Sequence, residues 1–418
     1  MNQNKPVPAT PRPGYKHSSL GWIPEEWEVV RVNEVATLIN GRGFKPHEWK
    51  EEGLPIIRIQ NLNGSTEYNY YLGDFNPKIL VEYGQLLFAW SGSKGTSFGP
   101  HVWKGKPGLL NYHTWKVNIE RRNIHDEFFL HILTYLTTKI EEKAHGASAL
   151  VHTQKGEMEK FPIPLPPLPE QRAIARILST WDQGIEALRK LIAARQQRKK
   201  GLMQQLLTGK KRVKGFGGEW REYHYGDILK QVKRPVNWND EELYELISVR
   251  RRSGGLFHRE SLYGHQILTK DLRTAKKGDF LISKMQVLHG ASGLTTYEFD
   301  GMKISGSYIA VVARNPATLD IKFFDWLSKM PYFYHQTYIA SYGVHIEKMT
   351  FDFKSFLKLE TYLPPLEEQR AIAAILQAAD REIALLEQKL AAMQQQKKGL
   401  MQALLTGVVR VKGGSNPP

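Results

Sequence analysis

The chain has 418 residues, enough for two or three domains that each bury a core. It carries 58 Lys and Arg against 42 Asp and Glu, which gives a formal net charge of +16 and a pI near 9.6. No apolar run reaches the roughly 18 residues of a membrane span, the N-terminus lacks the apolar core of a signal peptide, and the absence of Cys excludes disulfides and thiolate metal sites. We therefore expect a cytoplasmic protein that does not enter membranes, and the positive charge favours nucleic acid as its partner.

An internal repeat divides the chain. Residues 165–215 and 363–413 agree at 33 of 51 positions without a gap, whereas the segments that precede them hardly agree. The predicted order is a flexible N-terminal tail (1–20), a first head (21–164), a first long helix (165–214), a second head (215–362), a second long helix (363–410) and a flexible C-terminal tail (411–418).

Each head is predicted to combine short strands with an aromatic-rich helix. In the first head we expect strands within 27–35, 84–90 and 115–119 and a helix over 128–140. In the second head the corresponding segments are 220–228, 278–283, 309–312 and 323–330. The matching order predicts two copies of one α/β head whose loops have diverged, so the fold class is α+β.

Loops that carry cationic, amide and hydroxyl side chains are the candidate DNA contacts. Arg and Lys suit guanine edges, Gln and Asn suit adenine, and glycines allow the backbone to approach phosphate. The candidates in the first head are Arg42, Lys45, Arg58, Gln60, Asn61, Ser91, Ser93, Lys94 and Thr96. Those in the second head are Arg250, Arg251, Arg252, Lys284, Gln286, His289 and Ser292.

The repeated segments are predicted to be long helices. Each begins after a Pro pair and ends at Thr-Gly, and the roughly 38 residues between would span about 57 Å. Apolar residues recur at alternating spacings of three and four, which is typical of a coiled-coil seam. The seam residues are Leu178, Trp181, Ile185, Leu188, Ile192, Leu202 and Leu206 in the first helix, and Leu376, Ile383, Leu386, Leu390, Met393, Leu400 and Leu404 in the second.

Two helices of equal length and matching stripe favour an antiparallel pairing with each other, although each could instead pack on its own head. Lys199 and Lys397 interrupt the seam at the same register, which would favour one alignment over its slipped neighbours. Residues 194–214 contain eight Lys or Arg, Lys199 included, and no acid, and we expect these cations to lie along phosphate or a partner subunit. They are Arg195, Arg198, Lys199, Lys200, Lys210, Lys211, Arg212 and Lys214.

Motifs for chemistry are missing from the sequence. It contains no phosphate-binding P-loop, no dinucleotide-binding glycine pattern after a strand, and no metal-ligand spacing among its 14 His. We interpret Tyr112, His113 and His289 as structural or polar loop residues rather than catalytic bases. Asp300 and Lys303 could form half of a nuclease centre, but the rest of that pattern is absent. No catalytic residue and no metal ligand is therefore assigned.

The repeated peptide Leu-Pro-Pro-Leu-x-Glu-Gln-Arg-Ala-Ile-Ala, the Leu-Leu-Thr-Gly helix end, and the lead-in from Leu20 to Val30 resemble the specificity subunit of type I restriction–modification systems. So does the junction from Thr208 to Trp220. The resemblance implies that each head is a target recognition domain reading half of a bipartite double-stranded DNA sequence. It also implies that an antiparallel coiled coil separates the heads and docks two methyltransferase (modification) subunits.

The same resemblance implies that the chain is not an enzyme and binds no cofactor of its own. The complex would methylate adenine with S-adenosylmethionine, and restriction/translocase subunits would add ATP- and Mg²⁺-dependent cleavage. Two other hypotheses stay open from the residues. One is a coiled-coil scaffold that binds nucleic acid without sequence preference, and the other is a nuclease with an unrecognised site.

Overall fold

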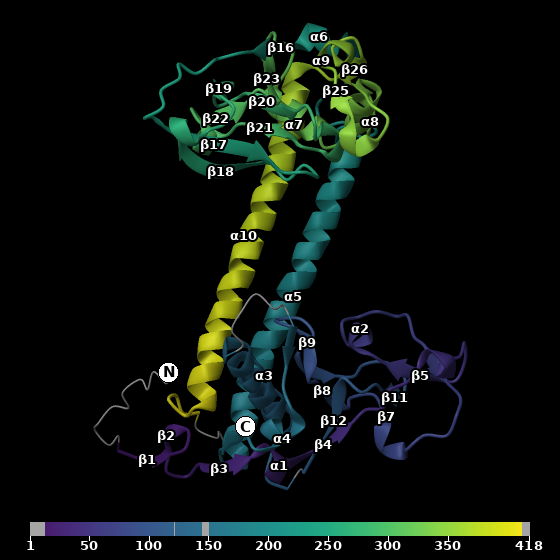
Figure 1. Cartoon of the computed structure of the whole chain (residues 1–418), viewed down its shortest axis with the longest axis vertical. Coiled ribbons are helices and arrows are strands. Elements are labelled where there is room, and N and C mark those ends of the chain that lie inside the picture. Colours follow the sequence, from purple (N-terminus) through teal and green to yellow (C-terminus); the bar gives the residue numbers. More distant parts are fainter. Residues whose placement is uncertain (1–12, 121, 144–149, 412–418) are drawn as a thin grey trace. The chain divides into compact units, whose positions relative to one another are not determined.

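The computed structural model describes residues 13–120, 122–143 and 150–411. The remaining parts of the two predicted tails, 1–12 and 412–418, lie outside the described residues. The chain forms two compact units. Unit 1 comprises residues 1–188 and 389–418, and unit 2 comprises residues 189–388. Both long helices cross from one unit to the other, so each unit holds one head together with half of each helix (Figure 1).

The long helices are α5 (Leu168–Leu206) and α10 (Leu366–Leu405). Their 39 and 40 residues correspond to about 58–60 Å of helix each. In unit 1 the first half of α5 packs against the second half of α10, and in unit 2 the second half of α5 packs against the first half of α10. The predicted antiparallel pairing is therefore confirmed in both units.

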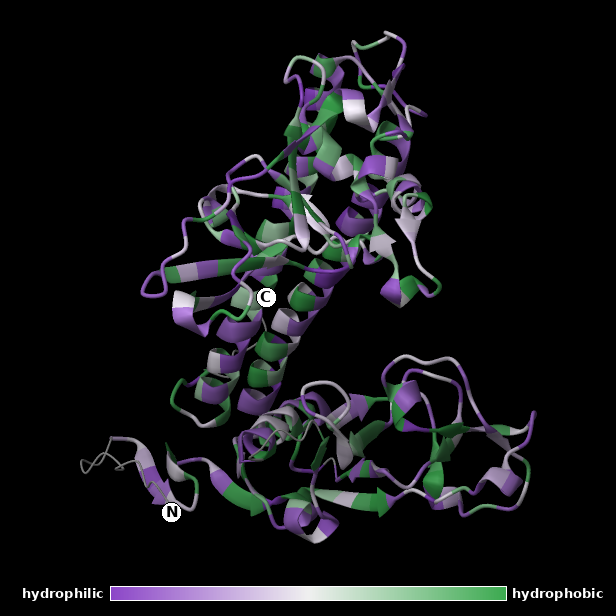
Figure 2. Ribbon diagram, turned by 45° about the horizontal axis from the view of Figure 1, so that its top comes forward, coloured by the Kyte–Doolittle hydropathy of each residue, from purple (hydrophilic) through white to green (hydrophobic). Residues whose placement is uncertain are grey.

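The apolar stripe of each helix faces its partner, and its residues alternate with hydrophilic bands in Figure 2. All fourteen seam residues are buried or half-buried: Leu178, Ile185, Leu188, Ile192, Leu206, Leu376, Ile383 and Leu404 are buried, and the other six are half-buried. The first turns of each helix also join the core of the head that precedes them, for example through Ile174 and Leu178 in unit 1. The sequence also allowed each long helix to pack on its own head. The structure shows such packing for the first turns of each helix.

Unit 1 contains two four-stranded sheets. The first, antiparallel throughout, has the order β10 (Gly99–Val102), β8 (Leu86–Ala89), β12 (Thr114–Ile119), β4 (Ala36–Asn40). The second has the order β6 (Tyr70–Tyr71), β5 (Leu54–Ile57), β11 (Gly108–Leu110), β7 (Leu80–Val81), and its β5 and β11 are parallel. Two-stranded pairs are β1 (Tyr15–Ser18) with β2 (Gly21–Pro24), β3 (Glu28–Arg31) with β14 (Pro162–Leu165), and β9 (Ser91–Ser93) with β13 (Leu150–His152).

Unit 2 repeats this strand order. Its antiparallel sheet runs β16 (Leu229–Val232), β23 (Tyr308–Ala313), β20 (Phe280–Ser283), β21 (Ser292–Leu294). Its second sheet runs β18 (Leu256–Tyr263), β17 (Leu243–Val249), β22 (Lys303–Ser305), β19 (Leu272–Thr274), again with one parallel pair, β17 and β22. The small pairs are β15 (Arg221–His224) with β26 (Glu360–Leu363), and β24 (Ser341–Tyr342) with β25 (Thr350–Phe351). The two heads therefore share one architecture.

Short helices complete the heads. Unit 1 has α1 (Val32–Val35), α2 (Ile59–Leu62), α3 (Asp126–Lys143) and α4 (Lys155–Glu159). Unit 2 has α6 (Tyr225–Ile228), α7 (Ile321–Leu327), α8 (Pro331–Ile339) and α9 (Phe353–Phe356). Phe128 and Phe129 of α3, and Phe323 and Phe324 of α7, are fully buried in the cores that also include the long helices.

Three sequence expectations need correction. The runs 27–35 and 220–228 are each a strand followed by one helical turn, because the Glu34 and Asp227 carboxylates accept hydrogen bonds from the backbone three residues earlier and so start a helix. The helix expected over 323–330 is α7, which begins two residues earlier and ends at Leu327, and a separate helix, α8, begins at Pro331. Within the predicted N-terminal tail, residues 15–18 form β1, and the Tyr15 hydroxyl donates to the Gly407 carbonyl at 2.7 Å.

The N-terminus of each long helix is tied to the end of the other by a buried carboxylate. In unit 1, Glu170 is 4% exposed and accepts two hydrogen bonds from Arg410, at 2.8 and 2.9 Å, and one from the Trp27 indole at 2.9 Å. In unit 2, Glu368 is fully buried and accepts two hydrogen bonds from Arg212. Each Arg lies three residues after the Gly that ends its helix. The repeat therefore encodes the same clamp twice.

The residue that follows each clamp carboxylate ties the helix to its own head. The Gln171 amide donates to the backbone carbonyls of Pro166 and Asn123 and accepts from the His125 backbone at 2.8 Å. Gln369 makes the matching contacts in unit 2, with its acceptor bond coming from the Asp320 backbone at 2.9 Å. Both amides are 1% exposed or less. Each long helix is thus anchored directly before α3 or α7.

The seam lysines form mirrored ion pairs. In unit 2 the Lys199 amine lies 2.6 Å from Asp380, and in unit 1 the Lys397 amine pairs with Asp182. Next to the second pair, His131 of α3 is 3% exposed, with Nδ1 3.9 Å from the Asp182 carboxylate and Nε2 3.3 Å from the Ser179 hydroxyl. Burial, followed by the positive charge of Lys397, lowers the pKa of His131 to about 4, although Asp182 and Glu127 act in the opposite direction.

Neutralising the clamp should destabilise the protein. Glu368→Gln replaces a buried carboxylate that holds Arg212, so we expect the free energy of unfolding to fall by about 2 kcal/mol. Its neighbour Glu367 is exposed and pairs only with Arg370 one turn on, so Glu367→Gln should change stability by less than about 0.5 kcal/mol. Urea unfolding of the two variants measures the difference, and equal effects would contradict a structural role for the clamp.

His131 should make stability depend on pH. The folded protein keeps this imidazole neutral, whereas the unfolded chain protonates it below its ordinary pKa of 6.5. The free energy of unfolding should therefore fall as pH drops from about 6.5 to about 4, and His131→Gln should reduce the loss between pH 7 and pH 5 by about 2 kcal/mol. Urea unfolding at both pH values tests this, with His47→Gln at an exposed position as the control that keeps the wild-type loss.

Candidate nucleic-acid interface

In unit 1 the predicted contact residues gather where β5 ends. Arg58 follows β5 directly, and its guanidinium donates to the Asn69 side chain at 3.1 Å and lies 5.4 Å from the Trp49 ring centre. Next to it is a hollow of about 160 Å³ that Gln60 also lines. Among the described residues, the exposed Gln60 amide donates to the Glu67 carbonyl, at 3.5 Å. Arg58 and Gln60 thus present polar groups at one surface.

The other wall of this hollow comes from the turn between β11 and β12. Tyr112 is 47% exposed, and its ring centre lies 3.8 Å from that of His113, which in turn packs edge-on against Trp90. Burial, followed by the charge of Arg58, lowers the pKa of His113. A neutral imidazole offers one donor and one acceptor, as a base edge does.

From the sequence alone, Tyr112 and His113 are interpreted as structural or polar loop residues. The hydrogen bond from the Asn111 backbone to the Ile57 carbonyl, at 3.1 Å, brings this turn beside Arg58. Because the contact joins segments more than 50 residues apart, sequence spacing could not reveal it. The parallel pairing of β5 and β11 is what assembles this part of the interface.

Arg42 extends the same surface on the far side of Asn111. Its backbone forms a parallel bridge with Asn111, and its guanidinium lies 4.9 and 4.8 Å from the ring centres of Phe44 and Tyr71. It is also paired with Glu48, and its side chain is 36% exposed. Lys45 starts the short turn that contains Glu48, and it is exposed. These contacts hold Arg42 in one orientation.

Asn61 has a different role from the one predicted. It is 6% exposed, accepts from the Arg58 backbone at 3.0 Å, and donates to the carbonyls of Ser65 and Glu67 at 3.2 and 2.8 Å. The Asn61 side-chain oxygen and both of the donor bonds of its amide nitrogen are therefore used within the chain. Asn61 shapes the loop that carries Gln60, and it drops out of the contact set that we propose below.

The loop from Ser91 to Thr96 leans on α3. The Lys94 amine donates to the Glu141 carbonyl at 3.1 Å, and the Gly95 backbone donates to the Glu141 carboxylate at 2.8 Å. Ser91 follows Trp90 directly and is half-buried in β9. Ser93 and Thr96 are exposed, and the Thr96 hydroxyl donates back to the Ser93 carbonyl at 3.3 Å. The loop thus forms a separate polar edge beside the aromatic group of Trp90 and His113.

In unit 2 the main feature is the hairpin tip between β17 and β18. The Arg250 guanidinium lies 4.3 Å from the Phe257 ring centre and donates to the Leu256 carbonyl at 3.0 Å. Arg252 and Ser253 have φ values of +58° and +55°, and they are the only non-glycine residues with positive φ among those described. Such strain costs on the order of 1–3 kcal/mol per residue and clusters at functional sites.

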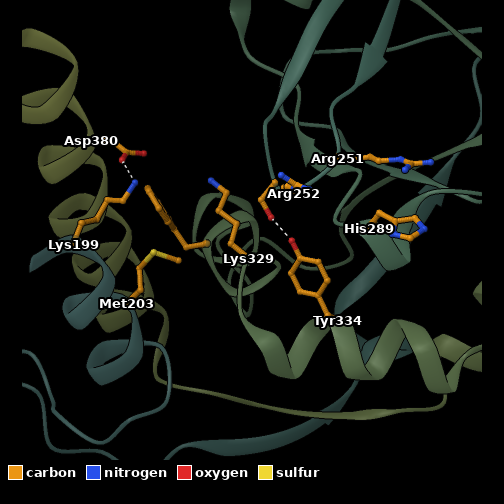
Figure 3. Close-up of a pocket in the computed structure, with 10 residues that line it drawn as sticks. Lys199, Met203, Arg251, Arg252, His289, Lys329, Tyr334 and Asp380 are labelled. Atoms are coloured by element: carbon orange, nitrogen blue, oxygen red, sulfur yellow. Dashed lines mark hydrogen bonds and ion pairs between the residues drawn. The ribbon is translucent and has the colours of Figure 1, made fainter. Parts of the chain in front are cut away.

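The strained tip is held by the loop that follows β20. The Arg252 backbone donates to the His289 carbonyl at 2.6 Å, and the Ser253 backbone donates to the Gly290 carbonyl at 2.9 Å. The Ser253 hydroxyl also bonds the Tyr334 hydroxyl at 2.7 Å. Arg251, Arg252 and His289 consequently line one pocket of about 710 Å³, shown in Figure 3.

Two of the predicted contacts in unit 2 are structural. Ser292 is 4% exposed within β21, and the Lys284 amine donates to the Gly306 carbonyl at 2.8 Å, so both hold the loop in place. Gln286 is half-buried, and its side-chain oxygen is fully buried without a hydrogen-bond partner among the described residues. We therefore keep Gln286 in the proposed contact set and remove Lys284 and Ser292.

Three cations of the basic run of residues 194–214 form ion pairs within the chain. Arg195 lies 2.7 Å from Glu382, Lys199 pairs with Asp380, and Arg212 belongs to the buried clamp. These three cations are engaged with carboxylates of α10. The described residues contain no group of three or more His, Asp or Glu suited to hold a metal, and no described helix combines the length and apolarity of a membrane span.

Comparison with known proteins identifies the family to which this chain belongs. The sequence model of the type I restriction modification DNA specificity domain matches residues 24–194 and again residues 219–395. These two spans cover most of the chain, and the chain belongs to this family. Each match contains one head and most of the helix that follows it, so the repeated unit of the family is the repeated unit seen here.

Relatives and solved structures agree over nearly the full length. The MjaVIII type I restriction enzyme specificity subunit of Methanocaldococcus jannaschii is 25% identical over 93% of this chain and 94% of its own length. The crystal structure of the type I S subunit from M. genitalium shares the fold, with a TM-score of 0.54, 15% identity, and coverage of 91% and 96%. A chain from a structure on assembly and conformational transition of a type I R-M system gives a TM-score of 0.57, 16% identity, and coverage of 93% and 99%.

Substitutions of the neighbouring loop residues Asn61 and Gln60 should have different effects, because we assign Asn61 a structural role and Gln60 a role in DNA recognition. Asn61→Ala removes three hydrogen bonds of a buried amide, so we expect a loss of about 1–3 kcal/mol in the free energy of unfolding. Gln60→Ala should leave stability within about 0.5 kcal/mol and lower the preference for the cognate duplex over a random one. Urea unfolding and competitive DNA binding measure the two effects, and the reverse pattern would contradict our assignment.

Proposed function

We propose that this chain is the specificity subunit of a type I restriction–modification complex, and that it binds DNA sequence-specifically. The observation that carries the proposal is the pairing of two heads with the same strand order but different surface loops, both attached to one repeated helical frame. A single protein built this way suits two different half-sites on one duplex. The net charge of +16 supplies the general attraction to DNA.

Each head would read one half-site through its own loops. In the first head the proposed contacts are Arg42, Lys45, Arg58, Gln60, Tyr112, His113, Ser91, Ser93, Lys94 and Thr96. In the second they are Arg250, Arg251, Arg252, Gln286 and His289. Arg58 and Gln60 carry the side chains suited to guanine and adenine edges.

The antiparallel helices would act as the spacer and as the docking platform for modification subunits. Half-sites read from one face of DNA lie about 34–36 Å apart per helical turn, which a helix of about 58 Å can accommodate. We expect two modification subunits, and restriction/translocase subunits that join them. S-adenosylmethionine, ATP and Mg²⁺ would be used by those partners in the cytoplasm, while this chain supplies recognition and no catalysis.

The proposal is tested by DNA discrimination. The chain, with its modification subunits, should prefer one bipartite duplex over random DNA by about 10³ or more at physiological salt. The target itself would be found by locating methylated adenines in the source genome, where it should appear as a two-part motif with a constant gap. Equal affinity for all duplexes would instead assign the chain to non-specific scaffolds.

Helix length should set the gap between the half-sites. Inserting one heptad into α5 and one into α10 at paired seam positions adds about 10 Å to the frame, so the preferred spacer should lengthen by about three base pairs. Footprinting on duplexes of graded spacer length measures this shift. An insertion into α5 alone is the control, because it mismatches the Lys199–Asp380 register and should destabilise the chain rather than move its preference. An unchanged spacer in the double insertion would contradict the role of the helices.

A further inference from the structure

The pocket of about 710 Å³ in unit 2 combines parts of the head and of the helical frame. One side is the strained hairpin tip with Arg252, another is the end of α7 with Trp326 and Lys329, and the third is α5 with Lys199 (Figure 3). Its lining contains four cationic side chains and one carboxylate, Asp380. Lys329 also pairs with Asp325, so the formal excess is two positive charges, which favours an anionic ligand.

Carboxylates and an aromatic ring position the two lysines of the pocket. The Lys329 amine lies 4.1 Å from the Trp326 ring centre and 2.8 Å from Asp325, and the Lys199 amine lies 5.8 Å from the same ring and 2.6 Å from Asp380. The side chains of Lys199 and Lys329 are 28% and 25% exposed. Trp326 thus separates two ammonium groups that point toward one cavity.

The hairpin tip places a further cation at the pocket. Arg252 and Ser253 have the positive φ values of a two-residue hairpin turn, which the Gly254 backbone closes by donating to the Arg251 carbonyl at 3.2 Å. The His289 and Gly290 carbonyls and the Tyr334 hydroxyl hold this turn against segments that line or adjoin the pocket, and the Arg252 side chain is exposed. The turn thus presents Arg252 at the rim of the pocket.

We infer that this pocket holds a backbone phosphate of the bound DNA, so that Lys199 of the helical frame contributes to DNA binding directly. This inference rests on the proposed function. A phosphodiester is favoured over a free anion because the Arg250–Gly255 tip, which we assign to the second half-site, forms one rim, and because the volume exceeds that of one phosphate and accommodates a continuing strand. The phosphate would connect the head and α5.

The mirrored pair in unit 1 supplies a matched control. Lys397 occupies the equivalent seam position and also pairs with an Asp, but its side chain is 14% exposed and lies beside the buried His131. Lys199→Gln and Lys397→Gln therefore remove the same kind of seam ion pair, whereas only Lys199 lines the pocket. A general effect on folding should appear in both variants.

The test measures binding of the full chain to duplex DNA over a salt series. We expect Lys199→Gln and Arg252→Gln each to flatten the slope of log K against log salt by about 0.9, and Lys397→Gln to leave it unchanged. In addition, single phosphates of the duplex can be replaced by uncharged methylphosphonates, one position at a time. At one position the replacement should weaken DNA binding by the wild-type chain but not weaken binding by Lys199→Gln any further. Equal slopes for the Lys199 and Lys397 variants would overturn the inference.

A free polyphosphate is the competing ligand, and pyrophosphate is the probe for it. If calorimetry shows pyrophosphate binding that Arg252→Gln abolishes while the DNA salt slope stays at the wild-type value, the pocket is a free-phosphate site and the DNA assignment is wrong. The slopes can be measured on any duplex. If the wild-type chain shows no preference for a bipartite target, the proposed function is wrong. The salt slopes would still decide whether the pocket binds a DNA phosphate.

Discussion

The buried carboxylate at the start of each long helix is the contact on which the rest of the structure depends. Glu170 and Glu368 are 4% and 0% exposed, and each is satisfied by an Arg that arrives from the end of the opposite helix. A buried carboxylate without its partner would be costly, so the clamp forms only when the two helices are antiparallel and in one register. The seam ion pairs of Lys199 and Lys397 select the same register from the middle of the helices.

This constraint explains where the repeat is strict and where it is not. The Pro-Pro, Glu-Gln and Thr-Gly elements make the clamp and the anchor to the head, and the Arg of the clamp lies at the same distance beyond each Thr-Gly. Gly209 and Gly407, with φ of +69° and +72°, turn the chain toward the clamp, and a Cβ at Gly407 would lie 2.4 Å from Pro24. The heads need only present α3 or α7 to this frame, so their loops are free to differ.

Local sequence patterns predict the two long helices and their pairing, whereas contacts between residues far apart in the heads cannot be predicted from such patterns. The seam was readable because a coiled coil depends on spacing within one helix. The clamp is harder to predict, because Arg212 lies within a run of cations in the sequence. The matching Arg410 in the second repeat is the signal that could identify Arg212 as part of the repeated structure. In the loops, Gln60 and Asn61 have similar chemistry in sequence, and only burial separates the exposed amide from the one that holds the loop. The recognition role that we propose for Tyr112 and His113 depends on the pairing of β11 with β5.

The two units differ most informatively at the point where the head meets the seam. His131 of α3 and Trp326 of α7 each follow the paired Phe residues that enter the core, and each lies beside a Lys–Asp pair of the seam. Both rings are buried, but the Lys397 side chain is 14% exposed whereas that of Lys199 is 28% exposed and lines a cavity. The hairpin tip of the second head forms the other side of that cavity. The same seam ion pair thus has different surroundings in the two units, because the heads differ while the register of the helices is kept.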